Sequence, residues 1–173
     1  HYSSRRQRQM CIRDSPKGVE LTHKNFEFEL DCLVSFLKYE QGAKFISWLP
    51  GAHVFGQALD NHYWIRTAMH MYIADNPLHT VDIAKEVQPN LFISVPRVYE
   101  KVYSNLKSAI ASKAILKYGL KIPGLKNVLK KKLQSAAGFG NLKFAISGAA
   151  PINPEILSFF QALDIPLYEG WGL

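Results

Sequence analysis

Short apolar stretches alternate with helical patterns along almost the whole chain, and this alternation limits the fold more than any other feature. Strands are expected at 44–49, 69–74, 90–95, 142–147 and 165–169, with a further short strand at 17–21. Helices are expected after caps at Thr22 and Thr80, the second of them ending before Pro89. Others are expected over 57–66, from Pro96 onward, and from a cap at Asn153 to about residue 162. Strands separated by helices predict an α/β fold, with a mainly parallel sheet and helices on both faces.

Composition fits a globular domain and excludes several other classes of protein. The chain has 173 residues, of which 47% are hydrophobic and 20% are charged, as is usual for a soluble domain. No apolar run approaches the roughly 18 residues needed to span a bilayer. Cys11 and Cys32 are the only cysteines, so neither a disulfide framework nor a paired-cysteine metal site is predicted. A reducing, cytoplasmic location is therefore expected.

The first 14 residues, HYSSRRQRQMCIRD, match nothing that follows them. They are rich in arginine but lack an apolar segment, which excludes a signal peptide. We interpret 1–14 as non-native sequence, with a disordered basic arm as the alternative. The domain is accordingly placed at 15–173.

The positive charge is concentrated in one segment. Between Lys101 and Pro154 there are ten lysines and no acidic residue. Within it, Lys113–Lys132 interleaves lysines with aliphatic residues, and Pro123-Gly124 should break any single helix there. One interpretation is a basic amphipathic surface in peripheral contact with an anionic membrane, and the other is a solvated insertion. No recognition motif accompanies the charge, so no nucleic-acid partner is expected.

Small and polar residues follow four of the predicted strands. The turns read PGAHVFG (50–56), PRVYE (96–100), GAAPINPE (148–155) and GWGL (170–173). Because ligands bind at the carboxyl ends of parallel strands, the four turns are expected to open on one edge of the sheet. The turn beginning at Gly148 would let a flat ligand approach the backbone, and Trp171 could stack on a purine. Tight turns that only allow packing are the alternative.

Two further residues in these turns leave a choice of roles open. Arg97 could face an anion or pair with a carboxylate such as Glu100, and the second role is the expected one. His53 follows a strand and could be catalytic, although a lone histidine is more often structural.

In order and approximate spacing, these motifs resemble those of the adenylate-forming enzymes. The segments are SPKGVELTHKN, SWLPGAHVFGQ, VQPNLFISVPRVYEKVY, KFAISGAAPINPEI and IPLYEGWGL. The resemblance is closest to the long-chain fatty acyl-CoA synthetases and covers Ser15–Leu173. It implies part of the large N-terminal domain of such an enzyme. It also implies a reaction in which a fatty carboxylate attacks the α-phosphorus of ATP, and coenzyme A then displaces AMP from the acyl-adenylate. ATP, Mg²⁺ and coenzyme A are the implied cofactors.

The resemblance also implies roles for individual residues. Those that match the end of the phosphate-binding loop are Lys17 and Gly18. Those that match the adenine-binding segments are Gly148, Ala149, Ala150, Pro151, Glu169, Gly170, Trp171 and Gly172. Those that match the motif bordering the acyl and carboxylate site are His53, Val54 and Phe55. Arg97 matches a position with a mainly structural role, and no metal ligand or catalytic residue is carried over.

This chain departs from the family pattern in several places. Trp171 stands where the family usually has Tyr, and Gly51 replaces a bulkier apolar residue. The front of the phosphate loop, the Thr-Glu pair, the ribose-binding Asp and the small domain with the catalytic Lys have no counterpart among the 173 residues. We therefore expect an internal piece of a longer ligase, inactive by itself in fatty-acid-dependent ATP–pyrophosphate exchange. The alternatives are an adenylation domain that loads a carrier protein, and a non-catalytic basic membrane-binding module.

Overall fold

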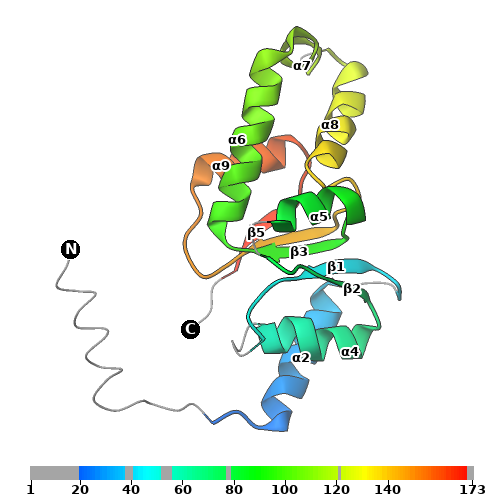
Figure 1. Ribbon diagram of the computed structural model, residues 1–173, viewed down its shortest axis with the longest axis vertical. Helices are drawn as coiled ribbons and strands as arrows, with labels where there is room; N and C mark the ends of the chain where they lie inside the picture. The colour runs from blue at the N-terminus through cyan, green and yellow to red at the C-terminus, as the bar shows by residue number, and fades with distance from the viewer. Residues whose placement is uncertain (1–19, 38–40, 52–55, 77–78, 121, 171–173) are drawn as a thin grey trace, which may run out of the picture.

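The chain folds into one five-stranded parallel sheet between two layers of helices (Figure 1). The computed structural model describes residues 20–37, 41–51, 56–76, 79–120 and 122–170. The strands are β1 (Lys44–Ser47), β2 (His70–Ile73), β3 (Leu91–Ser94), β4 (Phe144–Ser147) and β5 (Leu167–Glu169). They lie in the order β2-β1-β3-β4-β5, and every neighbouring pair is parallel. The predicted fold class is therefore confirmed.

Different helices cover the two faces of the sheet (Figure 1). One face carries α2 (His23–Leu37), the π-helix η1 (Gln57–Tyr63) and α4 (Trp64–Thr67). The other carries α5 (Thr80–Val87), α6 (Pro96–Ser112), α8 (Leu125–Ala136) and α9 (Pro154–Ala162), with α7 (Ala114–Gly119) at the far end of α6. All four residues of β3 are buried, as a central strand packed on both faces requires.

Alternate side chains of the central strands point into two separate hydrophobic cores. Phe92 and Ala145 belong to the larger core, together with residues of α5, α6, α8 and α9. Leu91 and Ile93 belong to the smaller core, together with residues of α2 and η1. This division follows from the two-residue period of a strand. It accounts for the near-continuous apolar runs seen in the sequence.

Capping signals explain where several helices begin. Thr22 caps α2, because its hydroxyl accepts from the backbone N–H of Asn25 at 3.4 Å and its own N–H donates to Asn25 Oδ1 at 2.9 Å. Pro96 occupies the first turn of α6, and Asn153 Oδ1 accepts from the N–H two residues later at the start of α9. These three predictions are confirmed. Thr80 is instead the first residue of α5, since the backbone of His79 is already helical and occupies the cap position.

Three sequence predictions need correction. In the stretch 17–21, the described residues Glu20 and Leu21 form no strand, and Leu21 is half exposed at the entry to α2. The helix expected over 57–66 forms, but its first seven residues are a π-helix that continues directly into α4. The alternation of 69–74 predicts that Met69 and Ile73 lie on one side of a strand, yet Met69 is buried while Ile73 is exposed, because β2 lies at an edge of the sheet.

The basic segment forms a helical excursion between β3 and β4. Helices α7 and α8 are separate, and the break falls at Pro123-Gly124 as predicted. At the other end of α8, Gly138 (φ +85°) closes the helix, because its N–H donates to Ser135 O and that of Phe139 donates to Gln134 O. This paired bonding is a Schellman motif, for which glycine is the usual residue. Nowhere in the described ranges is a helix both long and apolar enough to cross a membrane.

Candidate functional site

Four of the strand ends meet at one level of the sheet, as the sequence predicted. The register aligns Ser94 with Ser147 and Ser147 with Glu169, while Ser47 aligns with Ile73 on the other side. The turns that follow β1, β3, β4 and β5 therefore leave the same carboxyl edge. This edge is where ligands bind in open parallel sheets. We call it the carboxyl edge below.

The turn after β4 is largely exposed at the carboxyl edge. The Gly148 N–H donates to Ser94 O at 3.0 Å, which fixes the turn to the neighbouring strand. Ala149 then takes a left-handed conformation with φ +68°, and Ala149, Ala150 and Pro151 are all exposed. Their small side chains leave the backbone open to a flat ligand. The geometry therefore fits the role that the resemblance implied for this turn.

The end of β5 lies directly against this turn. The Gly170 N–H donates to Ser147 O at 2.7 Å. A Cβ atom added to Gly170 would lie 2.9 Å from Ile146 Cγ2, so a larger residue would displace its neighbour. Glu169 and Gly170 are exposed. Six of the eight residues predicted to contact adenine are thus brought to one place, while Trp171 and Gly172 lie outside the described residues.

Two buried hydroxyl groups lie at the base of this turn. Ser94 is 2% exposed and Ser147 is fully buried, yet among the described residues neither hydroxyl has a hydrogen-bond partner. A buried hydroxyl without a partner costs about 1–3 kcal/mol. A ligand or an ordered water at the carboxyl edge would relieve that cost. The sequence does carry a signal for these hydroxyl groups, because three strands end in the pair Ile-Ser.

The turn after β1 is held by a buried carboxylate that sequence reasoning missed. Ser47 Oγ donates to Asp60 Oδ2 at 2.6 Å, and the backbone N–H of Leu49 also bonds to this carboxylate. Burial raises the pKa of Asp60, and the two hydrogen bonds partly offset that rise. Asp60 lies in η1, so it ties the π-helix to the start of the turn. The acyl-site residues His53, Val54 and Phe55 belong to this turn but lie outside the described residues, as do Lys17 and Gly18.

A groove of about 620 Å³ opens beside the turn after β3. Trp48 forms part of its wall, and its indole N–H donates to Ile93 O at 2.8 Å. Arg97 and Glu100 both line the groove, but in this described region they form no ion pair with each other. Glu100 is therefore not the partner of Arg97, and the structural role of Arg97 stays a prediction. One helical turn of separation carries the two side chains to the same groove without bringing their charges into contact.

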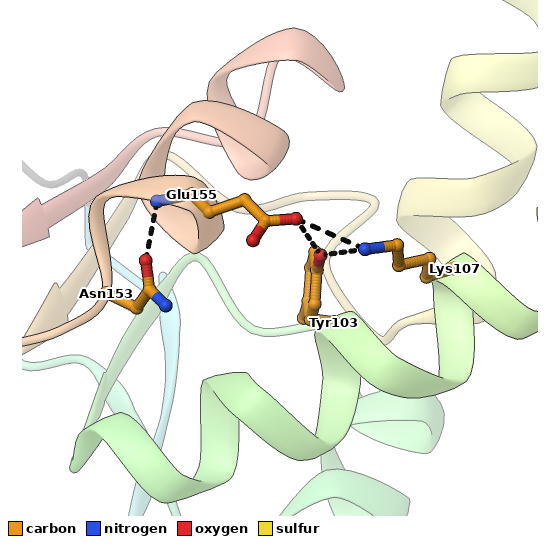
Figure 2. A network of polar contacts seen from close by, with 4 residues as sticks. All are labelled: Tyr103, Lys107, Asn153 and Glu155. Atoms are coloured by element: carbon orange, nitrogen blue, oxygen red, sulfur yellow. Dashed lines mark hydrogen bonds and ion pairs between the residues drawn. The ribbon is translucent and has the colours of Figure 1, made fainter.

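A polar network ties α6 to the beginning of α9 (Figure 2). The Tyr103 hydroxyl donates to Glu155 Oε1 at 2.6 Å, and Lys107 Nζ lies 3.1 Å from the same oxygen. The hydrogen bond from Tyr103, followed by the bond and charge of Lys107, lowers the pKa of Glu155. Because Asn153 caps the same helix turn, this network fixes the segment that leaves Pro151. The network therefore positions the candidate adenine turn, although none of its residues belongs to that turn.

The described residues offer no ready place for a metal ion. Within the described ranges, no cluster of three or more His, Cys, Asp or Glu side chains could hold one. His62, Arg66 and His70 follow one another at intervals of four, but α4 ends at Thr67 and His70 begins β2.

Known proteins match this chain over most of its length. It is 29% identical to the "Putative fatty-acid--CoA ligase fadD11" of Mycobacterium tuberculosis, over 92% of this chain and 33% of that protein. It is also 29% identical to the human "Long-chain-fatty-acid--CoA ligase ACSBG2", over 91% of this chain and 28% of that protein. The chain thus spans about a third or less of these relatives.

Solved structures agree with the fold. Apo MatB from Rhodopseudomonas palustris superposes with a TM-score of 0.63 at 19% identity, covering 93% of this chain and 27% of that one. The A-PCP didomain of a carboxylic acid reductase from Segniliparus rugosus, solved in complex with AMP, superposes with a TM-score of 0.55 at 21% identity, covering 75% of this chain and 18% of that one. The family description "AMP-binding enzyme" matches residues 15–173. This chain belongs to the AMP-binding enzyme family.

Proposed function

We propose that this chain contributes the adenine side of a site that activates a fatty acid with ATP and transfers the acyl group to coenzyme A. The observation that carries the proposal is the contact between the turn after β4 and the end of β5. There the Gly170 N–H bonds to Ser147 O beside the exposed backbone of Ala149. Both segments were assigned to adenine from the sequence, although the 17 residues from 152 to 168 separate them along the chain.

The reaction sets what each part of the site must do. A carboxylate attacks the α-phosphorus of ATP, which forms an acyl-adenylate and releases pyrophosphate, and the thiol of coenzyme A then displaces AMP. In this proposal the turn from Gly148 to Pro151 and the end of β5 hold the adenine ring edge-on, with Trp171 stacked on its face. Lys17 and Gly18 belong to the phosphate side, and His53, Val54 and Phe55 border the acyl group. Mg²⁺ would be bound by groups outside the described residues.

The names of the curated relatives favour coenzyme A as the acceptor. Both are called fatty-acid–CoA ligases. An acceptor thiol on a carrier protein is the second candidate, because a carboxylic acid reductase domain joined to its carrier domain shares the fold. The identities are too low to select a chain length, so a fatty acid is the substrate class that we propose.

Nucleotide binding by the 173-residue chain tests the adenine site directly. We expect AMP to shift the amide NMR signals of Gly148, Ala149 and Gly170 more than those of the rest of the chain. Ala149→Arg should abolish these shifts, because a long side chain would cover the backbone of the turn. Ala136→Arg, at an exposed position at the end of α8, is the matched control and should bind AMP normally. Equal shifts in both variants would contradict the assignment.

The reaction needs the parts that this chain does not span. It can be tested in a chimera in which residues 15–173 replace the matched segment of a curated relative. Fatty-acid-dependent exchange of labelled pyrophosphate into ATP reports the first step, and a thioester on coenzyme A reports the second. Exchange without any coenzyme A thioester, but with acyl transfer to a carrier protein, would favour the second candidate.

A further inference from the structure

We propose that the tip formed by α7 and the first turn of α8 is a docking surface for anionic lipid bilayers. This inference goes beyond the proposed reaction and does not depend on it. Figure 1 shows α6 rising from the sheet with α7 at its far end, and α8 returning toward the core. The tip is therefore the part of this helical excursion that lies furthest from the sheet.

The tip exposes more aliphatic surface than its packing requires. The exposed fractions are 65% for Ile115, 51% for Ile122 and 62% for Val128. These residues flank the Pro123-Gly124 break on both sides, so they gather around one end of the excursion. Meanwhile Leu116 and Leu129 point inward and belong to the larger core. Each of these two helices therefore has one apolar side that packs in the core and further apolar side chains that are exposed.

Positive charge surrounds the exposed aliphatic groups. Lys113, Lys126, Lys131 and Lys132 are all exposed, and no acidic residue occurs between Lys101 and Pro154. In the described chain, the ion pairs that this segment makes lie at its base. Lys107 pairs with Glu155, and Lys130 pairs with Asp164. The lysines around the tip therefore keep their charge available for an external partner.

Polar contacts fix the base of the excursion, and α7 packs against α8 at the tip. Lys130, only 10% exposed, bonds to Asp164 at 2.7 Å, and Gln134 donates to Leu163 O at 2.7 Å. At the tip itself, a Cβ atom added to Gly119 would lie 2.6 Å from Leu129 Cδ1, so α7 packs closely on α8.

Exposed aliphatic residues ringed by lysines match the chemistry of an anionic bilayer. The headgroups attract the lysines, each of which contributes about 1 kcal/mol near the surface, and the interfacial region accepts the aliphatic side chains. Nucleic acid would account for the lysines and could stack on Tyr118, the exposed aromatic residue of α7, but it leaves the exposed side chains of Ile115, Ile122 and Val128 unexplained. The combination of both features selects the bilayer.

Vesicle binding by the 173-residue chain tests the proposal. We expect binding to vesicles of phosphatidylcholine with phosphatidylserine, and at least tenfold weaker binding to vesicles of phosphatidylcholine alone. Lys113→Gln with Lys126→Gln should weaken binding by roughly 25-fold, because each lysine contributes about fivefold. The matched control is Lys24→Gln with Arg66→Gln, which removes the same charge from the opposite face of the sheet and should leave binding nearly unchanged.

The aliphatic contribution is tested separately. Ile115→Ser with Ile122→Ser should weaken vesicle binding roughly tenfold. It should also remove the binding that remains at about 1 M salt, where charges are screened within about 3 Å. The control is Ile65→Ser with Ile73→Ser, two equally exposed isoleucines away from the tip. Circular dichroism of every variant checks that it is folded.

Three outcomes would overturn the proposal. One is equal binding to both kinds of vesicle. Another is an equal loss in the control that removes Lys24 and Arg66, which would assign the effect to net charge. The third is binding of a double-stranded oligonucleotide that is lost in the variant lacking Lys113 and Lys126, by a chain that does not bind vesicles. Each readout is independent of AMP binding, so a failure here leaves the proposed function untouched.

Discussion

Replacing Gly138 by alanine should destabilise the protein more than any comparable glycine substitution in a turn. Gly138 has φ +85° in the Schellman motif that ends α8. A Cβ atom there would lie 2.5 Å from Ala84 C, 2.6 Å from Lys85 N and 2.7 Å from Ala84 O, all of them backbone atoms of α5. Neither helix can yield by rotating a side chain.

Two contributions set the size of the effect. The left-handed conformation costs alanine about 1–2 kcal/mol, and forcing an extra methyl group into packed structure costs about 1–3 kcal/mol more. We therefore expect Gly138→Ala to lower the free energy of unfolding by about 2–5 kcal/mol. Gly42 provides the matched control, because it has φ +82° but no atom within 4 Å of the added Cβ. Gly42→Ala should cost only the conformational part, about 1–2 kcal/mol.

Thermal unfolding followed by circular dichroism measures both variants against the parent chain. For a chain of this size each kcal/mol shifts the midpoint by about 2–4 °C, so the midpoint of Gly138→Ala should lie roughly 2–12 °C below that of Gly42→Ala. Equal midpoints for the two variants would refute the reasoning. They would mean that the close contact between the α8–β4 connection and α5 contributes nothing to the effect of the substitution on the free energy of unfolding.

Three further predictions follow from individual contacts. Tyr103→Phe should raise the pKa of Glu155 toward its ordinary value, and an NMR titration measures this change. Because the fold lowers this pKa, the carboxylate stabilises the protein above its unfolded pKa, and that stabilisation is lost as the pH falls through the folded pKa. An unchanged titration would contradict the network of Figure 2. Asp60→Ala should lower the unfolding free energy by about 2–4 kcal/mol, because it strands the Ser47 hydroxyl and the Leu49 N–H. Asp60→Asn should lower the unfolding free energy by less. Relative to the parent chain, its unfolding free energy should rise as the pH increases from the unfolded pKa near 3.8 through the raised folded pKa of Asp60. Parallel curves of unfolding free energy against pH would exclude a buried charge at this position. Tyr99→Phe should cost about 1 kcal/mol in denaturant unfolding, since the buried hydroxyl donates to Phe92 O at 3.0 Å, while Tyr168→Phe at an exposed site should cost nothing.

The sequence predicted the fold well where hydrophobic patterning decides the structure. The apolar run around Phe92 was predicted to be a strand, and that strand lies at the centre of the sheet. The caps at Thr22 and Asn153 were equally predictable, because a capping side chain bonds within three residues of itself. Even so, the strands are shorter than their apolar runs, since pairing with neighbours ends where the chain turns out of the sheet.

What the sequence could not predict depends on contacts between distant residues. Asp60 looked like an ordinary polar position in a helix, and its burial follows only from the π-helical geometry that turns it toward Ser47. The unpaired hydroxyls of Ser94 and Ser147 become visible only once β3 and β4 are in register. For the candidate site, the sequence identified the turn at Gly148 and its companion at Gly170 through resemblance. Their contact through Ser147 is what the structure added.

The long helical excursion between β3 and β4 also bears on how this protein can diverge. The two strands pair in the sheet, so the excursion is a closed loop whose ends are fixed by the Ser94–Ser147 register. For a loop that is already long, doubling its length adds only about 0.6 kcal/mol to the entropy of closure. Insertions and deletions near α7 are therefore inexpensive, and they leave the strand ends where they are. Evolution can remodel the tip of this molecule while the carboxyl edge, and the turn that begins at Gly148, stay in place.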